Sequence, residues 1–169
     1  IPEGIPGLGV AAQDVNLDGW PDLLIVSTKG SHLFLNDGKG KFKEAKCSPK
    51  TFHWPDAKGD DMVCGATIGD VNHDGLPDIL LGQHFKTPWI KPVANRLYLN
   101  QGIENGEPTF EDLTEKVGLL ALPMKSPHLE VQDFDNDGRM DVYASLVKFD
   151  SDGNPAPLIF KNMGNDKKS

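Results

Sequence analysis

Short apolar or alternating runs recur along the chain, and polar turns separate them. Runs of this length that are rich in Leu, Ile, Val, Phe and Tyr predict β-strands rather than helical stripes. The predicted strands span residues 22–27, 32–36 and 41–44, then 78–82, 95–100 and 109–114, then 141–146 and 157–162. A further short strand is predicted before each group. A complete unit is therefore expected to hold four antiparallel strands in meander order.

A nine-residue acidic loop follows the first strand of each unit. The copies read DVNLDGWPD from Asp14, DVNHDGLPD from Asp70 and DFDNDGRMD from Asp133. This pattern suits a calcium loop, because the side chains at positions 1, 3, 5 and 9 and the carbonyl of residue 7 offer oxygen ligands. The Gly at position 6 allows a sharp turn. The predicted ligands are Asp14, Asn16, Asp18, Trp20 and Asp22, then Asp70, Asn72, Asp74, Leu76 and Asp78, then Asp133, Asp135, Asp137, Arg139 and Asp141.

The alternative for these loops is a metal-free hairpin turn, because Asp, Asn and Gly all favour turns. Three copies with the same Gly and closing Asp favour a cation, since clustered carboxylates repel one another until they are neutralised. An EF-hand would need Glu at position 12, where Ile25, Leu81 and Ala144 stand. We expect about three Ca²⁺ per chain. The third loop, with four carboxylates, is expected to bind most tightly.

The repeated units predict an all-β fold, a β-propeller of four-stranded antiparallel blades. The predicted domain spans residues 1–169, with one blade at about 8–46, a second at about 62–115 and a partial third at about 128–163. Closure takes at least about four blades. We therefore expect a fragment of a larger propeller of about seven blades, or an open three-blade array that closes with other copies.

These units resemble the FG-GAP/VCBS repeats of integrin α-subunit-type propellers. The stretches 97–100, Leu-Tyr-Leu-Asn, and 110–114, Phe-Glu-Asp-Leu-Thr, are similar to the cartilage acidic protein (ASPIC) branch. The Phe-Gly and Gly-Ala-Pro signatures are absent around Gly9 and Gly65, so the VCBS-like variant fits better. The resemblance implies a calcium-binding module, secreted to the extracellular space or periplasm, that acts in adhesion or carbohydrate binding.

The net charge of −8 comes largely from the acidic loops, and it argues against nucleic-acid binding, which needs a basic face. No apolar run approaches the roughly 18–20 residues that cross a bilayer. The chain opens close to its first strand, which is consistent with a targeting segment upstream. Cys47 and Cys64 flank the insertion between the first two units. The sequence is compatible both with a disulfide between them and with two separate buried thiols.

Long insertions are predicted to gather on the rim opposite the acidic loops. They span residues 46–61, 84–93, 119–127 and 148–155. Trp54, His84 and Trp89 are candidates for a ligand-binding rim there, because binding sites concentrate on loops and Trp is a frequent hot spot. The alternative is that Trp54 and Trp89, each beside a proline, only hold their own loops in place.

No nucleophile, zinc or phosphate-loop motif is present, so we do not expect an enzyme. The preferred function is a calcium-stabilised module that binds an extracellular protein or glycan. The remaining blades of the same propeller, or other copies, are expected as partners for closure. The alternative is the propeller portion of a secreted, polysaccharide-active enzyme, whose active site lies elsewhere or on the insertion rim.

Overall fold

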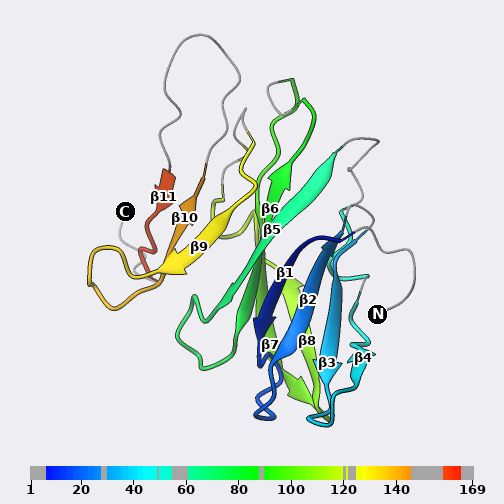
Figure 1. The fold of residues 1–169 in the computed structure, drawn as a ribbon. Coiled ribbons are helices and arrows are strands. Elements are labelled where there is room, and N and C mark those ends of the chain that lie inside the picture. The colour runs from blue at the N-terminus through cyan, green and yellow to red at the C-terminus, as the bar shows by residue number, and fades with distance from the viewer. Residues whose placement is uncertain are drawn as a thin grey trace.

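The computed structural model describes residues 7–27, 30–48, 50–54, 61–87, 90–119, 121, 125–145 and 158–164, which form three antiparallel sheets (Figure 1). The first sheet holds β1 (Gly7–Gln13), β2 (Asp22–Ser27), β3 (His32–Asn36) and β4 (Phe42–Glu44). The second holds β5 (Met62–Gly69), β6 (Asp78–His84), β7 (Arg96–Glu104) and β8 (Glu107–Asp112). The third holds β9 (Leu129–Gln132), β10 (Asp141–Ala144) and β11 (Leu158–Phe160).

Each sheet is an open meander in which strands that follow one another in the sequence are neighbours. The predicted all-β class and the four-stranded antiparallel unit are confirmed, and the third unit shows three strands among the described residues. We call these sheets blades 1, 2 and 3. The described residues include no helix that is long and apolar enough to cross a membrane.

The first strand of each blade lies beside the first strand of the next. β5 contacts β1 and β2 on one side and β9 on the other, and Figure 1 shows the blades fanned around these three strands. Gly9 and Gly65 permit this approach. A Cβ on Gly9 would lie 2.5 Å from the Cys64 carbonyl oxygen, and one on Gly65 would lie 2.1 Å from the Pro127 carbonyl oxygen. A side chain at either position would push two blades apart.

The apolar core lies between the blades, in two layers. Leu24 and Leu33 of blade 1 pack against Ile79 and Leu81 of blade 2. On its opposite face, blade 2 packs Leu80 and other residues against blade 3. Alternate residues of β6 therefore point into different layers, and this explains why the strand is apolar at successive positions rather than at every second one.

The aromatic residues of the 46–61 insertion belong to the first of these layers. Phe52 is fully buried, with its ring centroid 5.2 Å from that of Tyr98. Trp54 is only 3% exposed, with its ring centroid 5.1 Å from that of Phe85. Trp54, one of the candidates for the ligand-binding rim, is therefore largely buried, because the insertion folds back between blades 1 and 2. The alternative, an aromatic that holds its own loop in place, describes it better.

Both cysteines are free thiols and half-buried. Burial raises the pKa of the Cys47 thiol to about 11. Burial also raises the pKa of the Cys64 thiol, although the Lys125 ammonium acts to lower it. The structure therefore corresponds to two separate thiols rather than to the disulfide.

Candidate metal centres

The three acidic loops join β1 to β2, β5 to β6 and β9 to β10, and they share one backbone conformation. In each, position 4 and the Gly at position 6 are left-handed. The φ values are 56° at Leu17, 60° at His73 and 58° at Asn136, and 91° at Gly19, 85° at Gly75 and 85° at Gly138. The Gly was expected, whereas the left-handed residue at position 4 was not. Asn136 and His73 are types that are enriched in this conformation, whereas Leu17 is not.

Side-chain oxygens at positions 1, 3 and 5 face the interior of each loop and accept its backbone N–H groups. In the first loop, Asp14 accepts hydrogen bonds from the N–H groups of Asp18 at 3.1 Å and Gly19 at 2.7 Å. The Asn16 side-chain oxygen also accepts from Asp18, at 3.3 Å. The second and third loops repeat these contacts. The backbone therefore turns the side chains at these positions toward the interior of each loop.

The closing aspartates Asp22, Asp78 and Asp141 are buried, and each bridges two elements. In blade 2, Asp78 accepts one hydrogen bond from the Val71 N–H and another from the Asn100 N–H, both at 2.9 Å. The other two aspartates make the equivalent pair of bonds. Each carboxylate oxygen keeps a second lone pair for a cation. The aspartate at position 9 was expected only to complete a metal shell. It therefore has a second role, because it also connects the loop to the third strand.

Burial also perturbs the acidity of these aspartates. It raises the pKa of Asp78 to about 6, while the two backbone N–H groups act against it and the nearby Asp74 and Asp70 reinforce it. Burial likewise raises the pKa of Asp22. A buried carboxylate beside further carboxylates is an environment that a cation relieves.

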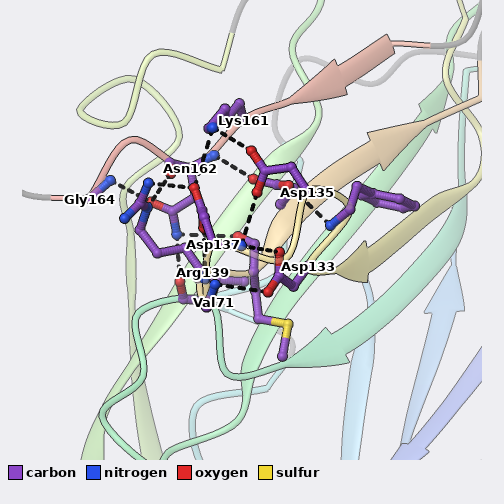
Figure 2. A network of polar contacts seen from close by, with 12 residues as sticks. Val71, Asp133, Asp135, Asp137, Arg139, Lys161, Asn162 and Gly164 are labelled. Carbon is purple, nitrogen blue, oxygen red and sulfur yellow. Dashed lines mark hydrogen bonds and ion pairs between the residues drawn. The ribbon is translucent and has the colours of Figure 1, made fainter.

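In the third loop the carboxylates visibly converge. Oxygen atoms of Asp133, Asp135 and Asp141 all lie within 4.8 Å of one another. Figure 2 shows Asp133, Asp135 and Asp137 in the same loop. Hard, all-oxygen donor sets of this kind suit Ca²⁺. The residues present therefore fit a calcium ion, which would be held by these side chains and the Arg139 carbonyl.

Two cations of the same blade accompany this loop. Lys161 forms ion pairs with Asp135 and, at 3.3 Å, with Asp137, and Arg139 pairs with Asp137 (Figure 2). Lys161 holds the pKa of Asp135 below its usual value. These two cations offset part of the extra negative charge that the fourth carboxylate gives this loop.

A repeated asparagine that we did not assign to the site closes each loop from the third strand. In blade 2, the Asn100 side-chain amide donates to the Pro77 carbonyl at 3.3 Å and to the Val15 carbonyl of blade 1 at 3.2 Å. Asn162 repeats this, and donates to Val71 of blade 2 at 2.9 Å (Figure 2). These asparagines connect each blade to the acidic loop of the preceding one. The signal in the sequence was an Asn ending each third strand.

The residue at position 7 packs within its own blade. The Trp20 ring lies against Gly38, where a Cβ would come within 2.4 Å of it, and Trp20 remains 51% exposed. Arg139 lies over Gly164 at ordinary van der Waals distance, since a Cβ there would lie 3.4 Å from the Arg139 Cδ, and nothing lies within 4 Å of a Cβ on Gly102 in blade 2. In blade 1, therefore, the glycine two residues after the third-strand Asn makes room for the Trp20 side chain.

A cavity of about 710 Å³ opens at the opposite ends of the strands, on the insertion side of blade 2. Trp54 and Phe85 line it, together with Arg96, whose guanidinium lies 4.9 Å from the Trp54 ring centroid and 2.6 Å from Asp112. The half-buried His84 does not line this cavity, and Trp89 lies outside the described residues. Of the two predicted rim residues that the structure describes, Trp54 borders the cavity as part of its aromatic wall and His84 does not.

Comparison with known proteins agrees with this geometry. Residues 14–81 match the FG-GAP-like repeat family, and this range contains the first two acidic loops. The chain is also 26% identical to mouse integrin alpha-3 over 153 residues, which cover 83% of this chain and 13% of that protein. The chain therefore spans only a small part of this relative's length.

Proposed function

The chain has the FG-GAP, integrin-α-like repeat fold, and from this premise we propose that it is a calcium-stabilised, extracellular module that binds a protein or a glycan. Its acidic loops would hold about three Ca²⁺ ions. The observation that carries the proposal is the convergence of Asp133, Asp135 and Asp141 in a loop whose backbone conformation occurs three times.

The role proposed for the metal is structural. Each loop lies between two strands, and its closing aspartate connects it to the rest of its blade. In blades 2 and 3, the asparagine Asn100 or Asn162 also connects it to the blade before it. A cation that neutralises the clustered carboxylates would stabilise the folded state over the unfolded one, because only the folded chain gathers these ligands.

Calcium-dependent melting tests the proposal. Thermal unfolding of the whole chain in excess Ca²⁺, in EGTA and in Mg²⁺ should show a large upward shift in Ca²⁺ alone, with about three ions bound per chain by metal analysis. Asp18→Ala, Asp74→Ala and Asp137→Ala should each remove part of the shift. Glu104→Gln, an exposed acidic position in β7, is the matched control. An unchanged melting temperature in Ca²⁺ with no bound metal would reduce the loops to turns.

Binding is proposed for the insertion rim, since the ligand-sized cavity lies there and the acidic loops lie at the other ends of the strands. The same cavity is the observation that favours the second candidate, the propeller portion of a polysaccharide-active enzyme. Incubation with glycans separates the two. Binding without turnover supports the non-enzymatic module, and cleavage that Arg96→Ala abolishes supports the enzyme.

A further inference from the structure

The turn between β7 and β8 of blade 2 reaches the first acidic loop, which belongs to blade 1. Its two residues, Asn105 and Gly106, are left-handed with φ values of 53° and 75°, the conformation of a tight hairpin turn. The Gly106 carbonyl accepts a hydrogen bond from the side-chain amide of Asn16, at 3.1 Å. Asn16 is one of the predicted calcium ligands and is only 8% exposed. A predicted metal ligand of one blade is therefore held by the next blade.

This contact fixes which end of the Asn16 amide faces the interior of the loop. A carbonyl can only accept, so the Asn16 nitrogen points to Gly106, and it also donates to the Asp18 carboxylate at 3.1 Å. The Asn16 oxygen is left on the loop side, where it accepts the Asp18 N–H at 3.3 Å. Calcium takes oxygen ligands. The Gly106 carbonyl therefore holds Asn16 in the orientation that a calcium ligand at position 3 requires.

Two further contacts hold the same part of blade 2 against blade 1. The Glu107 carboxylate, next to the turn, accepts the Lys46 N–H at 3.0 Å. The Asn100 amide donates to the Val15 carbonyl at 3.2 Å. Val15 and Asn16 are consecutive, so blade 2 holds two successive residues of the first acidic loop. The conformation of this loop and the docking of blade 2 on blade 1 consequently depend on the same hydrogen bonds.

We infer that the Gly106 carbonyl is a positioning group for calcium in the first acidic loop, and that this calcium and the docking of blade 2 strengthen each other. The inference rests on the proposed calcium binding and gives the first site a second role, at the junction of two blades. A cation on the Asn16 oxygen draws electron density from the amide and makes its N–H a stronger donor to Gly106. By linkage, docking raises calcium affinity by the same factor by which calcium favours docking.

Calcium titration by calorimetry tests the inference in chains that keep one intact loop. Asp74→Ala with Asp137→Ala leaves the first loop, and Asp18→Ala with Asp137→Ala leaves the second. The first comparison is between Asn16→Asp in the first chain and Asn72→Asp in the second, because each adds one carboxylate at position 3.

The two replacements differ in the contact that they remove. Asn72 is exposed, and its amide donates to Asp74 of its own loop at 2.9 Å. Asn72→Asp should therefore tighten calcium binding about threefold or more, through its added charge. Asn16→Asp instead sets a carboxylate against the Gly106 carbonyl, and it should give no gain. An equal gain in both loops would overturn the inference.

A second pair of variants changes no charge. Gly106 and Gly118 have φ values of 75° and 76°, and nothing lies within 4 Å of a Cβ added to either. Valine disfavours positive φ, so each replacement strains its own turn. In the chain that keeps only the first loop, Gly106→Val should weaken calcium binding about fivefold or more, whereas Gly118→Val should leave it unchanged. Unaltered affinity in the Gly106 variant, or an equal loss in both, would contradict the positioning role.

Thermal melting in Ca²⁺ and in EGTA gives an independent readout. With the three loops intact, Gly106→Val should lower the melting temperature more in Ca²⁺ than in EGTA, because it weakens the coupling, whereas Gly118→Val should lower it equally in both. The unaltered chain reports the proposed function separately. If calcium stabilises that chain but the first loop responds alike to both members of each pair, only the role of Gly106 is refuted. If the unaltered chain binds no calcium, both proposals fail.

Discussion

At the scale of single residues, Asp74 and Asp78 show that one loop contains two kinds of aspartate. Asp74 is exposed, and its backbone contact can be replaced by water, whereas Asp78 is buried and accepts two buried N–H groups. Asp74→Ala should therefore remove calcium stabilisation and leave the stability in EGTA almost unchanged. Asp78→Ala should lower the free energy of unfolding in EGTA by about 3 kcal/mol, since it leaves buried donors without partners. Urea denaturation in EGTA measures both.

Equal losses for the two variants in EGTA would show that the closing aspartate has no structural role of its own. Glu104→Gln again controls for the removal of an exposed negative charge.

Lys161 gives a second prediction at this scale. Its ammonium pairs with Asp135 and Asp137, so a calcium ion entering the third loop must compete with it. Lys161→Gln should strengthen calcium binding at this loop a few-fold, because it removes an exposed and therefore weak competing ion pair. Calcium titration by calorimetry measures the change. Lys116→Gln, which removes an exposed lysine paired with Glu111, is the control and should leave calcium binding unchanged. Weaker binding in the Lys161 variant would mean that the lysine orders the loop rather than competing.

Cys47 provides a prediction about pH. Burial raises the pKa of its thiol to about 11, and only the thiolate reacts with iodoacetamide. In the folded Cys64→Ser variant, the alkylation rate should therefore keep rising through pH 9 and 10, about tenfold per unit, where an ordinary thiol of pKa about 8.5 levels off. Mass spectrometry of timed samples measures the rate, and the same variant in denaturant shows the ordinary profile. A plateau near pH 9 in the folded chain would contradict the buried environment.

At the scale of strands and loops, the third-strand asparagines differ in what they connect. Asn100 joins blade 2 to the Val15 carbonyl of blade 1, whereas the Asn36 amide has only an acceptor within its own blade. Asn100→Ala should therefore cost about 1–2 kcal/mol more in free energy of unfolding than Asn36→Ala, which is the value of one hydrogen bond to a buried group. Denaturant unfolding in EGTA, at a concentration where the chain is monomeric, makes the comparison. Equal costs would show that the contact between blades contributes nothing.

Most of the strands and all three acidic loops could be predicted from the sequence. Strand positions follow from short apolar runs, and the acidic loops from the spacing of Asp, Asn and Gly, because both are local patterns. The buried closing aspartates could not be assigned their second role, since the Asp78 partners Val71 and Asn100 meet only when β6 pairs with β7. The cation pairing of the third loop was missed for the same reason, because Lys161 lies far along the chain from Asp135.

The burial of Trp54, in the insertion, could not be predicted from the local sequence pattern. Trp54 lies in an irregular, polar stretch, where local pattern predicts exposure, yet blades 1 and 2 leave a space that its ring fills against Phe85. No periodicity signals such a contact. It depends on how two sheets meet, and that is decided by Gly9 and by the length of the insertion rather than by the residues around Trp54.

At the scale of the whole molecule, the described blades form a short one-dimensional array, in which the strands of blade 2 contact both neighbours and those of blades 1 and 3 contact blade 2. Blade 2 is covered on both faces, as the complete burial of Ile79, Leu80 and Leu81 shows, whereas blade 3 has one covered face and one open face. In arrays of this kind, stability is approximately a sum of the terms for each unit and for each interface. Blade 3, with three described strands and one covered face, therefore has the smallest share of these stabilising terms and should open first.

Native-state hydrogen exchange in EGTA, on monomeric chain, tests this order. Amides of β6 should exchange most slowly and those of β9 and β10 faster, because blade 3 can open while the contact between blades 1 and 2 stays intact. Leu80→Ala should bring the opening of blade 3 forward, since it weakens the interface to that blade. Leu24→Ala, its equivalent between blades 1 and 2, should leave blade 3 unchanged. Uniform protection across β6, β9 and β10 would mean that the three blades unfold as a single unit and that their interfaces are too strong for the array to open stepwise.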